Sequence, residues 1–559
     1  MTDTSHVVGA TGMSLLEHTI GEALDLACEQ WPEQEALICV HQNLRFTWRQ
    51  LRRAADDFAA GLLAIGLQKG DRVGIWAPNC AEWTITQLAT ARAGIILVNI
   101  NPAYKASELK YTLNKVGVSA LVCVERVKST ECVNLVETVA PELFGAQPVD
   151  DQPGGAPSLR HAILIGGKSR PGWRRFADVA GLGSQEGHAR LAATAKTLDR
   201  HDPINIQFTS GTTGQPKGAT LSHRNILNNG LFVGTGMGLR AGDRLCIPVP
   251  LYHCFGMVMG NLACLVHGVT MIYPAETFDP LAVLRTCEQE RCTGLHGVPT
   301  MFIAELALPE FDRFDLSSLR TGLMGGAPCP IVVMRQVVDK MHMTDVGIAY
   351  GMTETSPVSF QSTVTDSLEQ RVTSIGTVQP HLEVKIVDGD GVTVPRNAPG
   401  ELCTRGYSVM IGYWNDEDRT SQAVDSEGWM HTGDLAVIDD DGYGHIVGRI
   451  KDMVIRGGEN IYPREIEEFL FTHPEIEAVE VVGVPDEKYG EELCAWIKLK
   501  SNSSLEAPDV IAFCKGQIAH YKIPKFVKFV TEFPTTVTGK VQKFQIREAT
   551  IRELGLKRP

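Results

Sequence analysis

Residues 203–232 read PINIQFTSGTTGQPKGATLSHRNILNNGLF, a sequence that places a hydroxyl-rich loop between two regular segments. An apolar-leaning run enters the loop, and a run typical of a helix leaves it. The ten residues from Thr209 to Gly218 include three glycines, one proline and a single lysine, Lys217. Glycine backbones can approach an anion closely, successive N–H groups can form an anion-binding nest, and the lysine adds a full charge. The stretch therefore predicts a phosphate-binding loop.

This loop differs from a Walker A loop at two positions. Counting from Gly211, the position that should be glycine is Pro216. The residue after Lys217 is Gly218, where a Walker A loop has Ser or Thr. A kinase or ATPase of that class is therefore disfavoured. Taken alone, the segment could also be a surface loop without a ligand, because loops rich in Gly and Thr are common.

The first hundred residues alternate between helix and strand signals. Thr47 and Gln50 form a capping-box pattern that predicts the start of a helix. A strand over residues 72–77, a helix opened at Pro78 and a strand over residues 94–100 follow. The same alternation recurs further along the chain. This order is typical of an α/β fold, in which mostly parallel sheets are covered by helices on both faces.

From about residue 380 the pattern changes to short strands and tight turns, which predicts a small antiparallel, barrel-like unit. Later, a helix opened at Pro463, two strands and a helix near residues 508–519 indicate a separate α+β unit. The predicted domains are residues 1–449, with 380–449 as a β-rich subdomain, and a mobile C-terminal domain over residues 450–559.

The composition narrows the class of protein. The 559 residues are 43% hydrophobic and 21% charged, which is ordinary for a globular protein. A net charge of −14 argues against nucleic-acid or anionic-membrane partners. No apolar run is long enough for a membrane span. We therefore expect small-molecule partners, and the oligomeric state stays open.

The 14 cysteines are scattered and include no CxxC pair, so we expect reduced thiols that act as small core residues. The N-terminus has no secretory or organelle signal pattern, which favours a cytoplasmic location. The histidines show no HExxH or other metal spacing, and we therefore expect no zinc site.

One pair of charged residues can be linked by a turn signal. Asp441 and Gly442 form a two-residue hairpin signal between two strand-like runs. With that register, residues whose numbers sum to 883 face each other, so Asp434 lies opposite Arg449. The pair could be a simple cross-strand ion pair, worth under about 1 kcal/mol if it is exposed.

Five motifs together resemble the adenylate-forming superfamily of acyl-CoA synthetases, peptide-synthetase adenylation domains and luciferases. They occur in the order found in that superfamily, and the resemblance covers about residues 20–550. The subgroup that the chain resembles most is the medium-chain fatty-acyl-CoA synthetases. The motifs are TSGTTGQPKG (209–218), YGMTET (350–355), HTGDLAV (431–437), GRIKDMVIRGGENIYP (448–463) and PTTVTGK (534–540).

The resemblance implies an ATP-dependent acid–thiol ligase that works in two half-reactions. A carboxylate attacks the α-phosphate of ATP, which releases pyrophosphate and gives an acyl-adenylate. A thiol, usually coenzyme A, then attacks the acyl carbonyl and AMP leaves. ATP, Mg²⁺ and coenzyme A are therefore the implied cofactors, and the first half depends on positioning and charge neutralisation.

The same resemblance implies roles for individual residues. Lys540, Glu354, Thr353 and Lys217 would be catalytic, with Glu354 as the Mg²⁺ ligand. Lys451 would be the hinge between the two domains, and Gly457, Gly458 and Glu459 would border the thiol channel. The implied ATP-binding residues are Thr209, Ser210, Gly211, Thr212, Thr213, Gly214, Gln215, Pro216, Lys217, Gly325, Gly326, Ala327, Tyr350, Asp434, Arg449 and Lys540.

The segment PLYHCFGMVMGNL (250–262) corresponds to the superfamily's acid-binding helix. Relatives that activate amino acids place an aspartate there, which this segment lacks. His253, Phe255 and Met257 instead predict an apolar pocket, which favours a medium-chain fatty acid as substrate. Aryl acids remain an alternative, as does an acyl-adenylate-forming or non-catalytic protein that serves another acceptor, such as a carrier protein.

Overall fold

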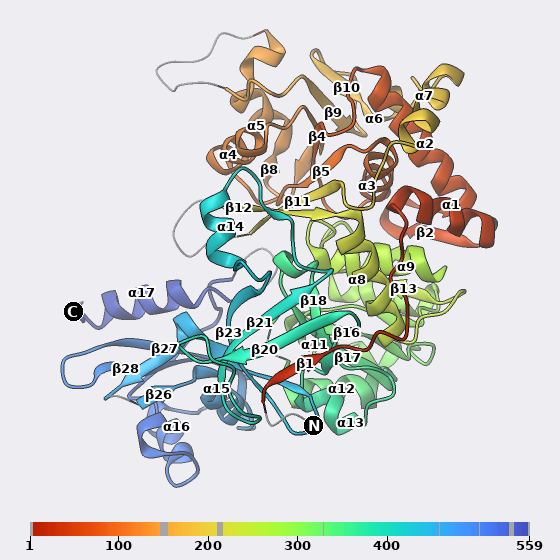
Figure 1. Ribbon diagram of the computed structural model, residues 1–559. Helices are drawn as coiled ribbons and strands as arrows, with labels where there is room; N and C mark the ends of the chain where they lie inside the picture. Colours follow the sequence, from red (N-terminus) through yellow and green to blue (C-terminus); the bar gives the residue numbers. More distant parts are fainter. Residues whose placement is uncertain are drawn as a thin grey trace.

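The computed structural model describes residues 4–145, 155–209, 216–327, 329–457, 459–501, 503–535 and 541–556. They form an α/β fold with two large, mainly parallel sheets and two smaller, mainly antiparallel ones (Figure 1). The predicted fold class is therefore confirmed. In Figure 1 the first large sheet lies in the upper part of the molecule, and the strands of the C-terminal region lie at the lower left.

The eight-stranded sheet has the order β10-β9-β6-β4-β5-β11-β12-β22 and is parallel from β10 to β11. Two antiparallel strands, β12 and β22, complete it. The strands are β4 (Arg72–Trp76), β5 (Ile96–Asn99), β6 (Ala120–Val124), β9 (His161–Ile165), β10 (Trp173–Arg175), β11 (Pro203–Thr209), β12 (Lys217–Ser222) and β22 (Gly412–Tyr413).

The nine-stranded sheet has the order β19-β18-β17-β16-β15-β13-β14-β2-β3, with a parallel centre and antiparallel edges. Its strands are β2 (Glu35–Cys39), β3 (Leu44–Thr47), β13 (Arg244–Cys246), β14 (Thr270–Tyr273), β15 (Gly294–Leu295), β16 (Thr321–Gly325), β17 (Asp345–Gly351), β18 (Val358–Gln361) and β19 (Thr377–Val378).

The antiparallel sheet β1-β20-β21-β23-β24 joins the N-terminal strand β1 to strands that begin at residue 382. A last sheet, β26-β25-β28-β27 with β29 beside β28, uses only strands after residue 453. The strands are β1 (His6–Val8), β20 (Leu382–Val387), β21 (Gly400–Gly406), β23 (Met430–Ile438), β24 (Gly444–Arg449), β25 (Val454–Arg456), β26 (Glu459–Ile461), β27 (Ile476–Asp486), β28 (Gly490–Leu499), β29 (Phe526–Phe529), and a separate pair, β7 (Arg126–Val127) and β8 (Thr130–Glu131).

The helices connect these strands. The α-helices are α1 (Ile20–Gln30), α2 (Trp48–Ala64), α3 (Ala81–Ala93), α4 (Ala106–Val116), α5 (Cys132–Val139), α6 (Phe176–Ala180), α7 (Gln185–Ala195), α8 (His223–Gly236), α9 (Ala263–His267), α10 (Pro280–Gln289), α11 (Pro299–Leu306), α12 (Ile331–Met341), α13 (Leu368–Thr373), α14 (Glu417–Ala423), α15 (Pro463–Phe471), α16 (Ala507–Cys514) and α17 (Lys543–Glu553). The short 3₁₀ and π segments are η1 (Val40–Gln42), η2 (Pro141–Phe144), η3 (Phe255–Leu262), η4 (Phe311–Arg313), η5 (Thr353–Thr355), η6 (Ile450–Asp452) and η7 (His520–Lys522).

Both large sheets are covered on two faces, as the sequence predicts. In β5, Ile96 and Val98 pack in a core with α4 and α5, whereas Leu97 packs in the core that holds α1, α2 and α3. In β16, Leu323 joins that second core and Met324 packs with α10, α11 and α12. The core shared by the two sheets also contains η3 and α8. It therefore fixes the π-helix η3 against strands of both sheets.

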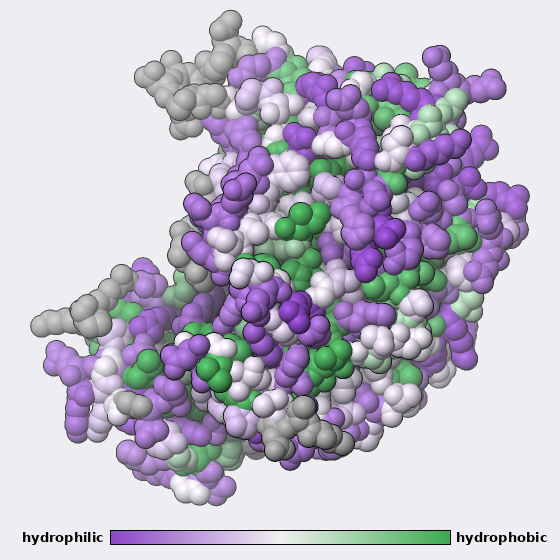
Figure 2. All heavy atoms as spheres, viewed as in Figure 1, coloured by the Kyte–Doolittle hydropathy of each residue, from purple (hydrophilic) through white to green (hydrophobic). Residues whose placement is uncertain are grey.

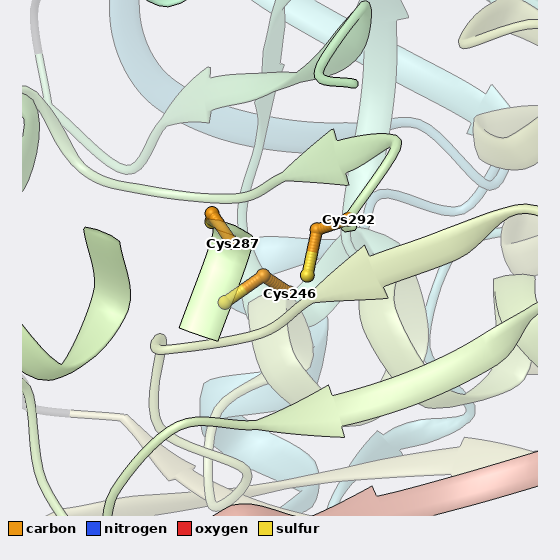
Figure 3. Close-up of side chains that lie close together, drawn as sticks. All are labelled: Cys246, Cys287 and Cys292. Atoms are coloured by element: carbon orange, nitrogen blue, oxygen red, sulfur yellow. The ribbon is translucent and has the colours of Figure 1, made fainter. Parts of the chain in front are cut away.

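The core next to α10 contains three cysteines whose sulfur atoms lie within 4.8 Å of one another: Cys246, Cys287 and Cys292 (Figure 3). All three are fully buried. All 14 cysteines of the chain are unpaired and buried, in agreement with the expected reduced thiols.

Several local predictions are confirmed or corrected. The capping box of Thr47 and Gln50 is present at the start of α2. Helix α3 begins at Ala81 and not at Pro78, because Cys80 takes the extended conformation of a capping residue. Helix α16 ends at Cys514, earlier than the predicted 519, because the next residue is extended and Gly516 has a positive φ.

No described helix is both long and apolar enough to cross a bilayer. On the face drawn in Figure 2, hydrophilic side chains predominate and the hydrophobic ones form small, separate patches. This face therefore offers no broad apolar area.

Candidate active site

The predicted phosphate loop connects the antiparallel strands β11 and β12. Thr209 ends β11 and pairs with Lys217, the first residue of β12. The carbonyl oxygen of Pro216 accepts a hydrogen bond of 3.0 Å from the hydroxyl of Tyr111 on α4. The predicted loop residues Ser210, Gly211, Thr212, Thr213, Gly214 and Gln215 lie outside the described residues.

Glu354 lies on η5, directly after β17, and only 5% of it is exposed. Its Oε1 accepts hydrogen bonds from the Thr209 hydroxyl (3.1 Å) and the Tyr413 hydroxyl (2.8 Å). The Lys217 ammonium lies 4.4 Å from the centre of the Tyr413 ring. The structure therefore brings the predicted residues Thr209, Lys217 and Glu354 together around one tyrosine.

Tyr413 is a site residue that the sequence interpretation missed. Burial, and then the neighbouring Glu354 carboxylate, raise the pKa of its hydroxyl, so it stays a hydrogen-bond donor at neutral pH. It reaches the site because β22 pairs with β12, placing Tyr413 opposite Ala219. No turn or periodic signal connects two segments so far apart in the chain.

A second group of predicted residues meets at Asp434 on β23. One carboxylate oxygen accepts a hydrogen bond of 2.7 Å from the Tyr350 hydroxyl, and the other lies 3.0 Å from Arg449 Nε. Asp434 is 7% exposed, whereas Arg449 is partly exposed. Burial, and then Asp434, raise the pKa of Tyr350. The buried carboxylate therefore has a donor on each oxygen, and Tyr350 contacts it through its hydroxyl.

The predicted pairing of Asp434 with Arg449 is confirmed, but the predicted turn is wrong. Near the turn the numbers of two paired residues sum to 882, as for Ile438 and Gly444. A bulge between Leu435 and Ala436 shifts the register by one residue, so that the numbers of Asp434 and Arg449 sum to 883 as predicted. The loop therefore holds three residues, 440–442, and not two. Asp439 explains the difference, because its Oδ1 accepts the backbone N–H groups of residues 441 and 443 and so widens the turn.

The predicted adenine segment, Gly325, Gly326 and Ala327, begins at the last residue of β16. A Cβ atom on Gly325 would lie 3.1 Å from the Ala349 carbonyl oxygen and 3.9 Å from the Phe255 ring. The absence of a side chain at Gly325 therefore lets β16, β17 and the predicted acid-binding segment approach closely. Gly326 has φ of +79°, a conformation that favours glycine.

The predicted acid-binding residues surround the start of η3, a π-helix, and such segments are frequent at functional sites. The His253 ring lies 4.4 Å from that of Tyr252, and the Phe255 ring lies 5.2 Å from that of His296. Met257 is fully buried.

Two amide side chains hold Met257 in place. Its sulfur accepts hydrogen bonds from Asn99 Nδ2 (3.1 Å) and Gln207 Nε2 (3.3 Å). Burial raises the pKa of the neighbouring Cys254 thiol to about 12, although hydrogen bonds with the side chains of Gln207 and Thr353 oppose that rise. Thr353 thus contacts the predicted acid-binding segment.

His296 is a second residue that the sequence interpretation missed. Burial lowers its pKa to about 4, so the imidazole is neutral. Its Nδ1 accepts from the Leu323 N–H, which leaves the proton on Nε2, 3.1 Å from the Met259 carbonyl oxygen. His296 therefore ties η3 to β16.

The predicted hinge and channel residues lie after β24. Lys451 lies on η6, and partial desolvation of its ammonium lowers its pKa. The N–H of Gly457 donates to the Tyr489 carbonyl oxygen (2.8 Å), and Glu459 pairs with Arg456 in the β25–β26 hairpin. These contacts connect neither residue with Glu354 or Asp434. Gly458 and Lys540 lie outside the described residues.

The sequence profile described as "AMP-binding enzyme" matches residues 24–414, and that of the "AMP-binding enzyme C-terminal domain" matches residues 465–540. The chain belongs to the AMP-binding enzyme family. It is 48% identical to the "Putative acyl-CoA synthetase YngI" of Bacillus subtilis (strain 168), over 97% of this chain and 99% of that relative. It is 46% identical to the "Medium-chain acyl-CoA ligase ACSF2, mitochondrial" of Bos taurus, over 99% and 91%.

Among solved structures, the chain is similar to "the anthranilate CoA ligase AuaEII in complex with anthranoyl-AMP". The TM-score is 0.83 at 26% identity, over 97% of this chain and 99% of that one. Family and relatives together identify the protein as an AMP-forming ligase of the acyl-CoA synthetase type. The alternative of a non-catalytic binder is therefore not supported.

Proposed function

We propose that this protein joins medium-chain fatty acids to coenzyme A in two steps, through an acyl-adenylate and with release of pyrophosphate and AMP. The observation that carries the proposal is the juxtaposition of two groups. Thr209, Lys217 and Glu354 gather around Tyr413, and Thr353, next to Glu354, contacts Cys254 at the start of the apolar π-helix η3. Polar groups suited to a polyphosphate thus adjoin an apolar segment without a carboxylate. The printed name of the bovine relative supports the choice of medium-chain acids.

The nucleotide would lie between the two groups of predicted residues. Asp434 accepts hydrogen bonds from the ribose hydroxyls and Arg449 donates one, while Tyr350 and the segment Gly325–Ala327 border the adenine. Tyr350 and Arg449 each contact one oxygen of the Asp434 carboxylate. Because an unpaired buried carboxylate is costly, nucleotide binding exchanges these donors for ribose hydroxyls.

The phosphates would lie against the loop between β11 and β12, whose residues 209–217 supply hydroxyls, N–H groups and the Lys217 charge. Glu354 suits Mg²⁺, since this ion is usually held by one or two carboxylates together with phosphate oxygens. Both described hydrogen bonds to the Glu354 side chain use Oε1, which leaves Oε2 for a cation. A bound Mg²⁺ would supply charge neutralisation to the phosphates.

The first chemical step would be an in-line attack of the substrate carboxylate on the α-phosphate. Lys540 and Lys217 would offset the negative charge that develops, and Thr353 would donate a hydrogen bond to the α-phosphate. The residues of η3 are largely buried, and they would keep water from the substrate carboxylate and so protect the acyl-adenylate from hydrolysis.

The second step would use a rotation between residues 1–449, including the subdomain 380–449, and residues 450–559. Lys451 lies on the short segment η6 between β24 and β25, where few backbone angles need to change. After rotation, Gly457, Gly458 and Glu459 would border the path of the coenzyme A thiol. The separate sheet and core of the C-terminal region support this division.

A pyrophosphate-release screen tests the substrate. Short, medium, long-chain and aryl acids are compared with and without coenzyme A, and thioesters are identified by mass spectrometry. We expect the highest kcat/KM with medium-chain acids and a thioester only with coenzyme A. A preference for aryl acids would replace the proposed substrate with the second candidate, which the similarity to the anthranilate CoA ligase favours. Adenylate without thioester would rule out coenzyme A as acceptor.

A further inference from the structure

Three side chains on β21 and β23 form a cluster outside the site described above. Cys403 and His431 are direct cross-strand partners, and Glu401 lies two residues before Cys403 on the same face of β21. His431 Nδ1 lies 2.9 Å from Glu401 Oε2 and 3.5 Å from Cys403 Sγ. One ligand atom from each residue lies within 4.8 Å of the other two. A carboxylate, a thiol and an imidazole therefore converge on one point.

A bulge in the sheet helps to form this cluster. Cys403 pairs with His431, whereas Glu401 pairs with Leu435, so β23 carries extra residues between these two pairs. Gly433, within the bulge, has φ of +70° and donates its N–H to Glu401 Oε1 at 3.0 Å. This hydrogen bond directs the carboxylate of Glu401 towards His431.

The sulfur-to-nitrogen distance fits tetrahedral coordination of zinc, whereas the 2.9 Å between His431 Nδ1 and Glu401 Oε2 is a hydrogen bond that an entering ion has to open by about 0.5 Å. Zn–S and Zn–N bonds of about 2.3 Å and 2.0–2.1 Å separate the sulfur and nitrogen ligands by about 3.5 Å in a tetrahedron. The Cys403 Sγ to His431 Nδ1 distance is 3.5 Å. The His431 and Glu401 side chains are 35% and 21% exposed, so water can supply a fourth ligand.

Asp425 places a carboxylate near the second ring nitrogen of His431, where zinc-binding histidines commonly have one. Its Oδ2 lies 3.8 Å from Nε2 of His431, on the side of the ring away from Cys403 and Glu401. Two backbone N–H groups, from Glu427 and Trp429, hold the other oxygen. At 3.8 Å this contact is longer than a hydrogen bond, so Asp425 fixes the tautomer and orientation of the imidazole only when ion binding brings the two side chains closer.

We propose that Glu401, Cys403 and His431 form a binding site for a divalent transition-metal ion of the zinc class. Without the ion, His431 Nδ1–H donates to Glu401. On binding, the imidazole carries its proton on Nε2, facing Asp425, and the Cys403 thiol releases its proton to solvent. The ion thus receives one sulfur, one nitrogen and one carboxylate oxygen.

Cys403 carries the proton that it is proposed to release when the ion binds. Burial, and then Glu401, raise the pKa of Cys403 to about 12, so the metal-free residue is a thiol. Coordination to a divalent ion deprotonates such a thiol. The other sulfur-rich cluster, Cys246, Cys287 and Cys292, is a weaker candidate because all three residues are fully buried and offer an ion no solvent-exposed ligand.

Cobalt is the probe for the first experiment, because Co²⁺ reports thiolate ligation by absorption. The reduced chain, purified without a histidine tag and treated with a chelator, is titrated with Co²⁺. We expect a thiolate-to-cobalt charge-transfer band that saturates at one ion per chain and disappears when Zn²⁺ is added. Absence of the band would overturn the proposal.

Four variants locate the ion. Cys403→Ser should abolish the charge-transfer band. Asp425→Asn retains all three ligands and should weaken binding by about 10- to 100-fold. Two controls should bind as the unaltered chain does: His445→Ala, which removes a histidine paired with Asp439 on the same sheet, and Cys287→Ser in the buried cluster. A band that survives in Cys403→Ser and is lost in Cys287→Ser would overturn the proposal.

X-ray absorption at the zinc edge tests the unaltered chain and does not depend on the folding of any variant. We expect one sulfur at about 2.3 Å and two or three nitrogen or oxygen ligands at about 2.0–2.1 Å. Three sulfur ligands would place the ion at the buried cysteines and would contradict the proposal.

Discussion

At the residue scale, the candidate site depends on hydroxyl groups that donate to buried carboxylates. Tyr413 donates to Glu354, and Tyr350 donates to Asp434. Each hydrogen bond satisfies a carboxylate that is at most 7% exposed. Since an unsatisfied buried charge is costly, these tyrosines hold the carboxylates ready for their ligands.

The variant Tyr413→Phe tests this role. It keeps the ring beneath the Lys217 ammonium but removes the donor to Glu354. We expect adenylate formation to slow by roughly 10- to 100-fold, because a hydrogen bond to a charged group contributes about 1.5–3 kcal/mol. The rate is measured by pyrophosphate release at saturating acid.

Tyr443→Phe is the matched control, since the Tyr443 hydroxyl donates to Asp366, outside the two groups around Tyr413 and Asp434. It should leave the rate unchanged. An equal rate in Tyr413→Phe and the unaltered chain would show that this hydroxyl does not position Glu354.

At the element scale, α11 carries a buried glutamate, Glu305, whose carboxyl group is unsatisfied within the part of the chain that the structure describes. Glu305 is 1% exposed, and neither of its carboxylate oxygens has a hydrogen-bond partner among the described residues. Burial raises the pKa of this carboxyl well above its usual range, which favours its neutral form in the folded protein. The folded state then binds a proton that the unfolded state has released, and stability falls as pH rises above the unfolded pKa.

Glu305→Met should therefore stabilise the protein, by about 1–3 kcal/mol for removing an unsatisfied polar group. The gain should be larger at pH 8 than at pH 5, because only the glutamate has to bind a proton on folding. Thermal unfolding at several pH values measures it, with Glu186→Gln, an exposed glutamate on α7, as control. A gain that does not depend on pH would contradict the neutral carboxyl.

Elements with local signals could be predicted from the sequence, and pairings between distant segments could not. The capping box of α2 and the pairing of Asp434 with Arg449 depend on neighbours in the chain, and both are present. Tyr413 reaches Glu354 only because β22 joins β12, and no local pattern specifies that pairing. Cys403 and His431 meet across β21 and β23 for the same reason, so histidine spacing gave no sign of a metal site.

At the scale of the whole molecule, the predicted hinge separates two half-reactions. η6 joins the sheet that carries Asp434 to the sheet that carries Gly457. Its backbone is partly fixed, because the Met453 N–H donates to the Arg449 carbonyl oxygen at 3.0 Å. A rotation about Lys451 would have to change this connection.

A pair of variants tests the rotation. Lys540→Ala should slow adenylate formation by roughly 10²–10³-fold, as expected for the loss of one preorganised electrostatic donor, yet convert pre-made acyl-adenylate to thioester. Lys451→Pro should do the reverse, because proline fixes φ and the hinge can no longer change its backbone angles. Each half-reaction is measured separately. Equal loss of both half-reactions in two folded variants would rule out the rotating mechanism.

The two-residue strand β22 also has a consequence for how the chain is made. Thr209 and Glu354 are 145 residues apart, and Tyr413 is synthesised later still. At roughly 5–20 residues per second, the ribosome needs roughly 10 to 40 seconds to pass from Thr209 to Tyr413. Throughout that interval β12 is an uncovered edge of the nascent sheet, the kind of edge that pairs with other chains. The strand that completes the candidate site is thus also the one that ends this vulnerable stage of synthesis.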